Sequence, residues 1–118
     1  MEGQRNYFRE RVAKKAAGGV YDDVVFGPVV VGRHYHIQRS VAEDETSAPT
    51  GDLRILATRG GDNHILRSQE TPLAGVAYAD PDPVELTEGE QLMARFYGAT
   101  ANDLLRFYVH GWWWEVGE

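Results

Sequence analysis

The sequence contains no cysteine among its 118 residues. This absence excludes disulfide bonds, thiolate metal sites and cysteine nucleophiles, which leaves histidine, carboxylate and hydroxyl groups for any chemistry. The sequence also lacks an apolar run near the roughly 18 residues that cross a membrane, and its first 15 residues lack the apolar core of a signal peptide. We therefore expect a soluble protein without a membrane partner.

A chain of this length, with 42% hydrophobic residues, suffices for one core and is too short for two ordinary domains. Its net charge is −6, yet residues 1–18 carry five basic and two acidic side chains, a charge of +3 that leaves −9 on the remainder. A basic segment on an acidic body can dock on an acidic surface, either of another copy of the chain or of a different partner. The other interpretation is that the basic segment is simply exposed to solvent. Because the acidic body repels phosphate, we expect no nucleic-acid partner.

Residues 4–17 have the pattern of an amphipathic helix, with Phe8 and Val12 at an interval of four and good helix formers between them. The apolar stripe is narrow, so such a helix must pack on its own sheet, on a neighbouring subunit or on a larger assembly. The β-branched stretch that follows is interrupted by a Gly-Pro pair, which predicts an edge strand or an extended arm. We therefore predict a basic helix or arm over residues 1–28 and a β-sandwich domain over residues 29–118.

The domain itself has the pattern of a β-protein. Short β-branched and aromatic segments recur at intervals of about ten residues without helices between them, which favours an antiparallel sandwich or barrel. In the clearest segment Leu92, Ala94 and Phe96 fall on one face and Arg95 on the other. The last segment alternates in the same way, with Leu105, Phe107 and Val109 on one face and Arg106 and His110 opposite. The predicted fold is all-β, an antiparallel β-sandwich of jelly-roll type. The expected strands are 29–41, 53–58, 64–68, 75–79, 91–97 and 103–113.

Three consecutive tryptophans, Trp112 to Trp114, close the last predicted strand. If the strand continues through them, Trp113 points opposite to its two neighbours, so at least one ring reaches the surface or an interface. Tryptophan is enriched at binding surfaces because it buries a large apolar area and keeps a polar atom for hydrogen bonding. Sugar stacking and subunit packing are both compatible with this cluster, as is a structural role with two rings in the core and one at the end of the sandwich.

His34 and His36 resemble the HxH of the first cupin motif, with His64 as the third metal ligand. In that motif a glutamate follows within a few residues, whereas the nearest carboxylate here is Glu43. The match to a metal-binding barrel is therefore partial.

Alternation along the same strand gives Tyr35, Ile37 and Val41 the buried face, which turns the histidines outward. An acidic loop at residues 80–85 offers oxygen ligands for calcium, but its two prolines predict a rigid turn first. No serine lies in a motif that marks a nucleophile. We therefore expect surface histidines, no cofactor and no enzymatic activity.

The phrases VVVGRHYHIQRSVAEDET and PLAGVAYADPDPVELTEGEQLMARFYGATANDLLRFYVHGWW resemble small jelly-roll proteins of tailed bacteriophages and related viruses. In those proteins two late strands are joined by a turn with Gly-Ala and Asp, here Gly98-Ala99 and Asp103. The resemblance implies a capsid decoration or cement subunit located in the virion. It also implies a homo-oligomer, often a trimer, that binds the major capsid protein or other virion proteins.

These observations predict a virion structural subunit that buries part of its apolar surface against neighbouring molecules. The N-terminal segment would anchor it to an acidic shell or an adjacent protomer, and the C-terminal aromatics would pack around a symmetry axis. A carbohydrate-binding sandwich that uses exposed Trp or Tyr is the alternative, and a cupin-like metalloenzyme comes after it. The predicted partner-binding residues are Arg5, Phe8, Arg9, Arg11, Val12, Trp112, Trp113 and Trp114.

Overall fold

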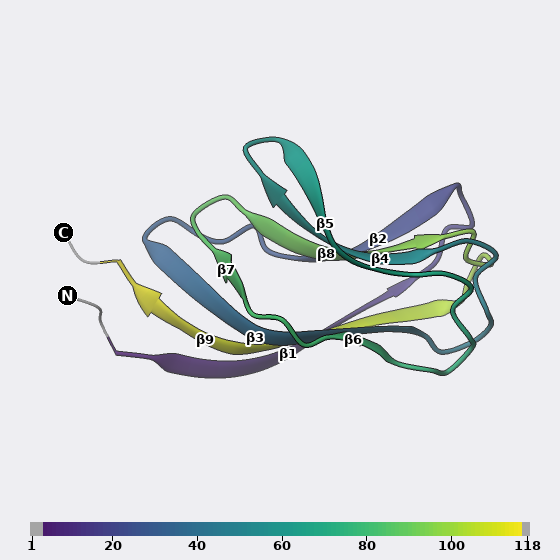
Figure 1. Cartoon of the computed structure of the whole chain (residues 1–118), viewed down its shortest axis with the longest axis horizontal. Coiled ribbons are helices and arrows are strands. Elements are labelled where there is room, and N and C mark those ends of the chain that lie inside the picture. The colour runs from purple at the N-terminus through teal and green to yellow at the C-terminus, as the bar shows by residue number, and fades with distance from the viewer. Residues whose placement is uncertain (1–3, 117–118) are drawn as a thin grey trace.

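The computed structural model describes residues 4–116, which form nine β-strands in two antiparallel sheets packed face to face (Figure 1). The strands are β1 (Asn6–Lys15), β2 (Tyr21–Phe26), β3 (Arg33–Asp44), β4 (Leu53–Arg59), β5 (Asp62–Gln69), β6 (Tyr78–Asp80), β7 (Val84–Leu86), β8 (Gln91–Tyr97) and β9 (Leu104–Glu115). This arrangement confirms the predicted all-β sandwich. No helix long and apolar enough to cross a membrane occurs between residues 4 and 116.

The strand order is that of a jelly roll. The five-stranded sheet runs β1-β9-β3-β6, with β7 paired to another part of β3, and the four-stranded sheet runs β2-β8-β4-β5. Because β6 and β7 follow one another along β3, they act as one interrupted strand. Counted in this way, eight strands divide equally between two sheets, as in double-sheet jelly rolls.

The helix predicted over residues 4–17 is wrong, because residues 6–15 form β1, which pairs with β9 along its whole length. An interval of four places Phe8 and Val12 on one side of either a helix or a strand, since four is a multiple of the strand period. Glu10 is polar and lies between them, so the apolar alternation of a strand is interrupted in the sequence. In the folded chain, pairing with β9 outweighs the helix propensity of these residues.

The segment expected as an arm over residues 1–28 supplies one strand to each sheet. β1 pairs with β9, and β2 pairs with β8 from Tyr21 to Phe26. The described part of this segment is therefore built into the sandwich that was expected to begin at residue 29. Residues 1–3, and residues 117–118 of the predicted domain, lie outside the described part of the chain.

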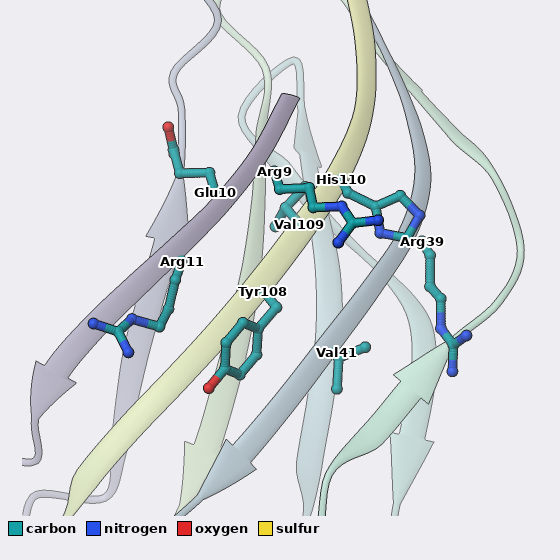
Figure 2. A pocket seen from close by; sticks show the side chains of 8 residues that line it. All are labelled: Arg9, Glu10, Arg11, Arg39, Val41, Tyr108, Val109 and His110. Carbon is teal, nitrogen blue, oxygen red and sulfur yellow. The ribbon is translucent and has the colours of Figure 1, made fainter. Parts of the chain in front are cut away.

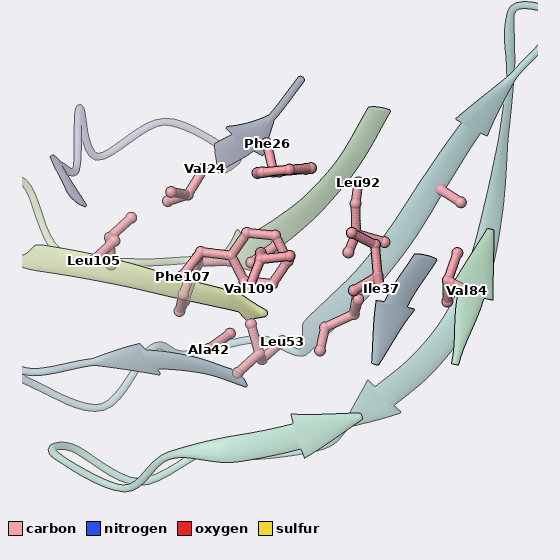
Figure 3. Packing of buried hydrophobic residues seen from close by; sticks show 14 of the residues in the cluster. Val24, Phe26, Ile37, Ala42, Leu53, Val84, Leu92, Leu105, Phe107 and Val109 are labelled. Atoms are coloured by element: carbon pink, nitrogen blue, oxygen red, sulfur yellow. The ribbon is translucent and has the colours of Figure 1, made fainter. Parts of the chain in front are cut away.

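The core lies between the two sheets and follows the predicted alternation of β8 and β9. Leu92 and Phe96 of β8 and Leu105 and Phe107 of β9 are fully buried. Figure 3 shows Phe107 and the side chains around it filling the space between the sheets. Full burial of one such side chain contributes about 1.5–3 kcal/mol, so this cluster positions the strands that carry the surface residues described below.

A bulge in β3 changes which side chains face outward. The register of β3 against β9 shifts between Ile37 and Arg39, which leaves Gln38 as an extra residue. The predicted burial of Ile37 is confirmed, but the prediction for Val41 is wrong: Ala42 is buried and Val41 lies on the outer side. One extra residue inverts the alternation beyond it, and the sequence pattern does not reveal where a bulge occurs.

Candidate functional site

The outward-pointing side chains of the five-stranded sheet form a continuous surface, here called the basic face. It consists of three cross-strand rows of β1, β9 and β3, flanked by Arg5, His34 and Trp114. The rows are Tyr7, Trp112 and His36; then Arg9, His110 and Arg39; then Arg11, Tyr108 and Val41.

Pairing of β1 with β9 brings most of the predicted partner-binding residues onto this one face. Arg5, Arg9 and Arg11 come from the N-terminal segment, and Trp112 and Trp114 come from the C-terminal cluster. Roughly a hundred residues separate the two groups in the sequence. Antiparallel pairing joins them, as it joins any two strands whose registers match.

The other three predicted binding residues pack within the protein. Phe8 stacks on Phe26 at 5.6 Å between ring centroids, and Val12 packs against the buried core. Trp113 faces Tyr35 on the opposite side of β9 from the other two tryptophans, as the alternation predicted. The guanidinium of Arg33 covers its ring at 3.8 Å.

Trp112 and Trp114 are stacked against histidines rather than laid open as a flat platform. The ring of His36 lies 4.1 Å from Trp112 and that of His34 lies 4.4 Å from Trp114, with interplanar angles of 17° and 15°. Tyr7 and the Arg5 guanidinium contact Trp112 from the β1 side, at 5.8 and 4.7 Å. Both sides of Trp112 are therefore occupied, and its ring face is not free for a sugar.

Glu85 of β7 holds both histidines. Its two carboxylate oxygens accept hydrogen bonds from His34 Nε2 at 3.1 Å and from His36 Nδ1 at 2.5 Å. The other ring nitrogen of His36 lies 3.0 Å from the side-chain oxygen of Gln38. These contacts fix the orientation of the rings that stack on the tryptophans.

The three histidines of the cupin-like hypothesis do not come together. His34 and His36 lie on the five-stranded sheet, whereas His64 lies on β5 at the edge of the other sheet. Within residues 4–116 no group of three histidine, aspartate or glutamate side chains is placed to hold a metal ion. In the acidic loop proposed for calcium, Asp80 accepts the backbone N–H of Asp82 while Glu85 contacts the histidines.

A groove of about 410 Å³ crosses the basic face beside the stacked rings (Figure 2). Its lining residues are Arg9, Glu10, Arg11, Arg39, Val41, Tyr108, Val109 and His110. In the cross-strand register His110 stands between Arg9 and Arg39, and Figure 2 shows Arg9 reaching across β9 toward it. Neighbouring side chains in such a row are about 5 Å apart, so one ligand can contact several of them.

No carboxylate of the described residues forms an ion pair with the three arginines of this groove. Within residues 4–116, Arg9, Arg11 and Arg39 make no ion pair and no side-chain hydrogen bond, although each is exposed. Four other arginines, Arg54, Arg59, Arg95 and Arg106, each pair with a carboxylate, as Arg106 does with Glu45 at 2.7 Å. Arg9 and Arg11 were among the predicted binding residues, whereas Arg39 was not, because only the bulge at residue 38 turns Arg39 outward.

A buried carboxyl pair joins the end of β3 to the start of β9, away from the groove. Asp44 accepts the backbone N–H groups of Thr46 and Ser47, and Asp103 accepts the Ser47 hydroxyl. Burial, together with the hydrogen bond to Asp103, raises the pKa of Asp44 from 3.8 to about 6. The second carboxyl oxygen of Asp44 has no other partner, so this pair retains a proton at mildly acidic pH.

Comparison with known proteins gives similarity of structure only. No protein-family model matches the chain, and no curated protein matches it. A solved structure described as "CBM4 structure and function" is 14% identical, with a TM-score of 0.39, over 89% of this chain and 82% of that one. The exo-beta-1,3-galactanase of Phanerochaete chrysosporium, solved with galactose, is 14% identical, with a TM-score of 0.40, over 91% of this chain and 29% of that one. At this level of identity the likeness concerns the fold alone.

Proposed function

We propose that this protein is a non-catalytic structural subunit that docks through its basic face on an acidic protein surface of a larger assembly. The observation that carries the proposal is the groove in which Arg9, Arg11 and Arg39 pair with no carboxylate of the described part of the chain, although the net charge is −6. A planar guanidinium binds a carboxylate through two parallel hydrogen bonds. A partner that presents Asp and Glu side chains would therefore form ion pairs with these arginines.

The rest of the basic face suits a protein partner. The edges of the stacked rings of Trp112 and His36 adjoin the charged row and offer apolar area next to it. Aromatic residues and arginine are the types most enriched at protein interfaces. Charge complementarity would speed association and set the register, while the rigid ring stacks would lose little conformational freedom on binding.

The virion is the assembly that we propose as the setting, on the resemblance of residues 29–114 to small phage jelly-roll proteins. Its acidic surface would belong to the major capsid protein or another virion protein. β1 then replaces the helix expected at the N-terminus as the anchoring element, because it carries Arg9 and Arg11 on the outer side.

The test is co-sedimentation of the purified protein with particles assembled without it. Arg39→Glu reverses one unpaired charge in the groove and should move the protein to the supernatant, as should raised salt. Arg67→Glu, an exposed site on β5 of the other sheet, is the matched control and should sediment like the wild type. If the Arg39→Glu variant sediments with the particles as the wild type does, docking through this groove is refuted.

A second candidate function, binding of an acidic polysaccharide, is favoured by Tyr7. This side chain is 73% exposed beside the groove and can stack on a sugar ring, whereas Trp112 cannot. A glycan array with neutral and carboxylated or sulfated glycans separates the two candidates. Retention of acidic glycans by the wild type, lost in Tyr7→Ala, would favour this second function.

A further inference from the structure

The outward side of the four-stranded sheet, here called the neutral face, has a different composition. One apolar row crosses all four of its strands in register: Val25, Met93, Leu56 and Ile65. These side chains point away from the core, because their chain neighbours Val24, Ala94 and Ile55 belong to the buried cluster between the sheets. The middle of the row is covered within the chain, since Leu56 and Met93 are 2% and 6% exposed, and Ile65 at its end stays accessible.

The arginines beside this row are neutralised within the face. Arg95 binds Asp23 through two hydrogen bonds of 2.8 and 3.0 Å, and Arg54 binds Asp52 at 3.2 Å. The Arg95 guanidinium also covers the ring of Tyr21 at 4.0 Å. The hydrogen bonds to Asp23 hold the pKa of Arg95 above its usual range, so the pair stays ionised and the face carries no uncompensated charge.

The accessible part of the neutral face lies at its two edges. Ile65 on β5 is 56% exposed and Tyr21 on β2 is 46% exposed, whereas Leu56 and Met93 between them are already covered. Tyrosine, methionine and arginine are the residue types that distinguish the centres of protein interfaces from other surfaces. Lysine is absent from the strands of this face.

We infer that the neutral face is a self-association surface, on which a second copy of this chain packs about a two-fold axis. In a two-fold contact each residue meets the same patch of the partner, so any unpaired charge on the patch opposes itself. The basic face, with three unpaired arginines, fails this condition. The neutral face meets it, because both of its arginines already have carboxylates.

The neutral face is the outer face on which a second copy meets the least charge repulsion. Chains of net charge −6 repel one another, and the repulsion is smallest where the contact surfaces are internally neutral. Back-to-back packing would also leave both basic faces pointing outward and free. The dimer does not depend on the docking function proposed for the basic face.

Sedimentation velocity of the full chain across a concentration series tests the inference. We expect a species of twice 13.2 kDa for the wild type, and its persistence at high salt, because apolar contact rather than charge drives the association. Ile65→Arg places an unpaired charge in the contact and should raise the dissociation constant about 100-fold. Leu73→Arg is the matched control, since it changes another exposed apolar residue, in the loop after β5, and should dimerise like the wild type.

A wild type that stays at 13.2 kDa at every concentration overturns the inference, as does an Ile65→Arg variant that dimerises normally. A second measurement covers the case in which that variant does not fold. The chain has no cysteine, so Ile65→Cys accepts a single nitroxide label. A defined distance between labels of two copies supports the dimer, and the absence of dipolar coupling rejects it. Arg39→Glu should leave the dimer intact, so failure of the dimer and failure of docking are separate results.

Discussion

The two outer faces of the sandwich differ in how their arginines are neutralised. On the basic face Arg9, Arg11 and Arg39 line a groove and form no ion pair with any carboxylate of residues 4–116, whereas on the neutral face Arg54 and Arg95 each bind one. An unpaired exposed arginine costs the folded monomer little, because a surface ion pair stabilises by only about 0–1 kcal/mol. The difference therefore concerns partners more than stability: the arginines of the basic face can still bind a partner's carboxylates, whereas those of the neutral face are already paired.

The total charge of the chain conceals this contrast. A net charge of −6 predicts repulsion of anions by the molecule as a whole. The fold nevertheless gathers basic side chains of β1 and β3 around His110 on one side. Local fields act over about 8 Å at physiological salt, so a partner that approaches the basic face encounters the arginines before the distant acidic residues.

The largest expected effect comes from Gly111→Ala, at a buried position of the sheet that carries the basic face. A Cβ at this position would overlap the backbone oxygen of His36 on the neighbouring strand, next to the bulge. Because the backbone of the two strands would have to move apart to relieve this overlap, we expect the free energy of unfolding, measured by urea denaturation, to fall by roughly 3 kcal/mol. Gly19→Ala is the control, since its Cβ would have 3.9 Å to its nearest neighbour, and equal stability of the two variants would contradict the prediction.

Asp44→Asn should change the pH dependence of the free energy of unfolding of the whole sandwich. This global effect distinguishes it from variants that act on one outer face. The folded chain binds the Asp44 proton more tightly than the unfolded chain, since the pKa is raised from 3.8 to about 6. This contribution to the free energy of unfolding is present below pH 3.8 and is lost as the pH rises through about 6. The loss is about 3 kcal/mol.

The measurement is a set of urea unfolding curves for the wild type and Asp44→Asn across this pH range. Asparagine keeps an acceptor for the backbone N–H groups and cannot ionise, so the difference between the two proteins should grow in favour of the variant with rising pH. Parallel curves at all pH values would show that the carboxyl of Asp44 titrates normally.

Asp23→Asn should make the neutral face resemble the basic face, with a smaller effect on stability. It leaves Arg95, which is mostly buried, with a weaker partner, and we expect the free energy of unfolding to fall by about 1.5 kcal/mol. The uncompensated arginine should also weaken self-association in sedimentation velocity, because two copies now oppose like charges. Asp52→Asn changes the more exposed pair and should cost less than 1 kcal/mol. If both variants dimerise like the wild type, neutrality is not what permits the contact.

Much of the fold follows from local pattern. The alternation of β8 and β9 predicted Phe96 and Phe107 in the core and Trp113 opposite its neighbours, because a strand with one buried face leaves a period of two in the sequence. β1 was mistaken for a helix because an interval of four fits both periods. Val41 was assigned to the core because a bulge leaves no trace in the alternation.

The candidate site was accessible to sequence reasoning only in part. The basic N-terminal residues and the tryptophans were singled out by composition, but nothing local shows that β1 and β9 are neighbours. Glu85 was considered only as a calcium ligand, and its contact with His34 and His36 depends on β7 pairing with β3.

The sequence by itself determined the class of fold, the core residues of β8 and β9 and the absence of thiol chemistry, because these depend on composition and on periods shorter than one strand. Tertiary structure alone decided which charges are neutralised. Ion pairs such as Asp23 with Arg95 join residues far apart in the chain, and so does the row of Arg9, His110 and Arg39. Long-range strand pairing sets these distances, and charges interact according to distance in space rather than separation in sequence.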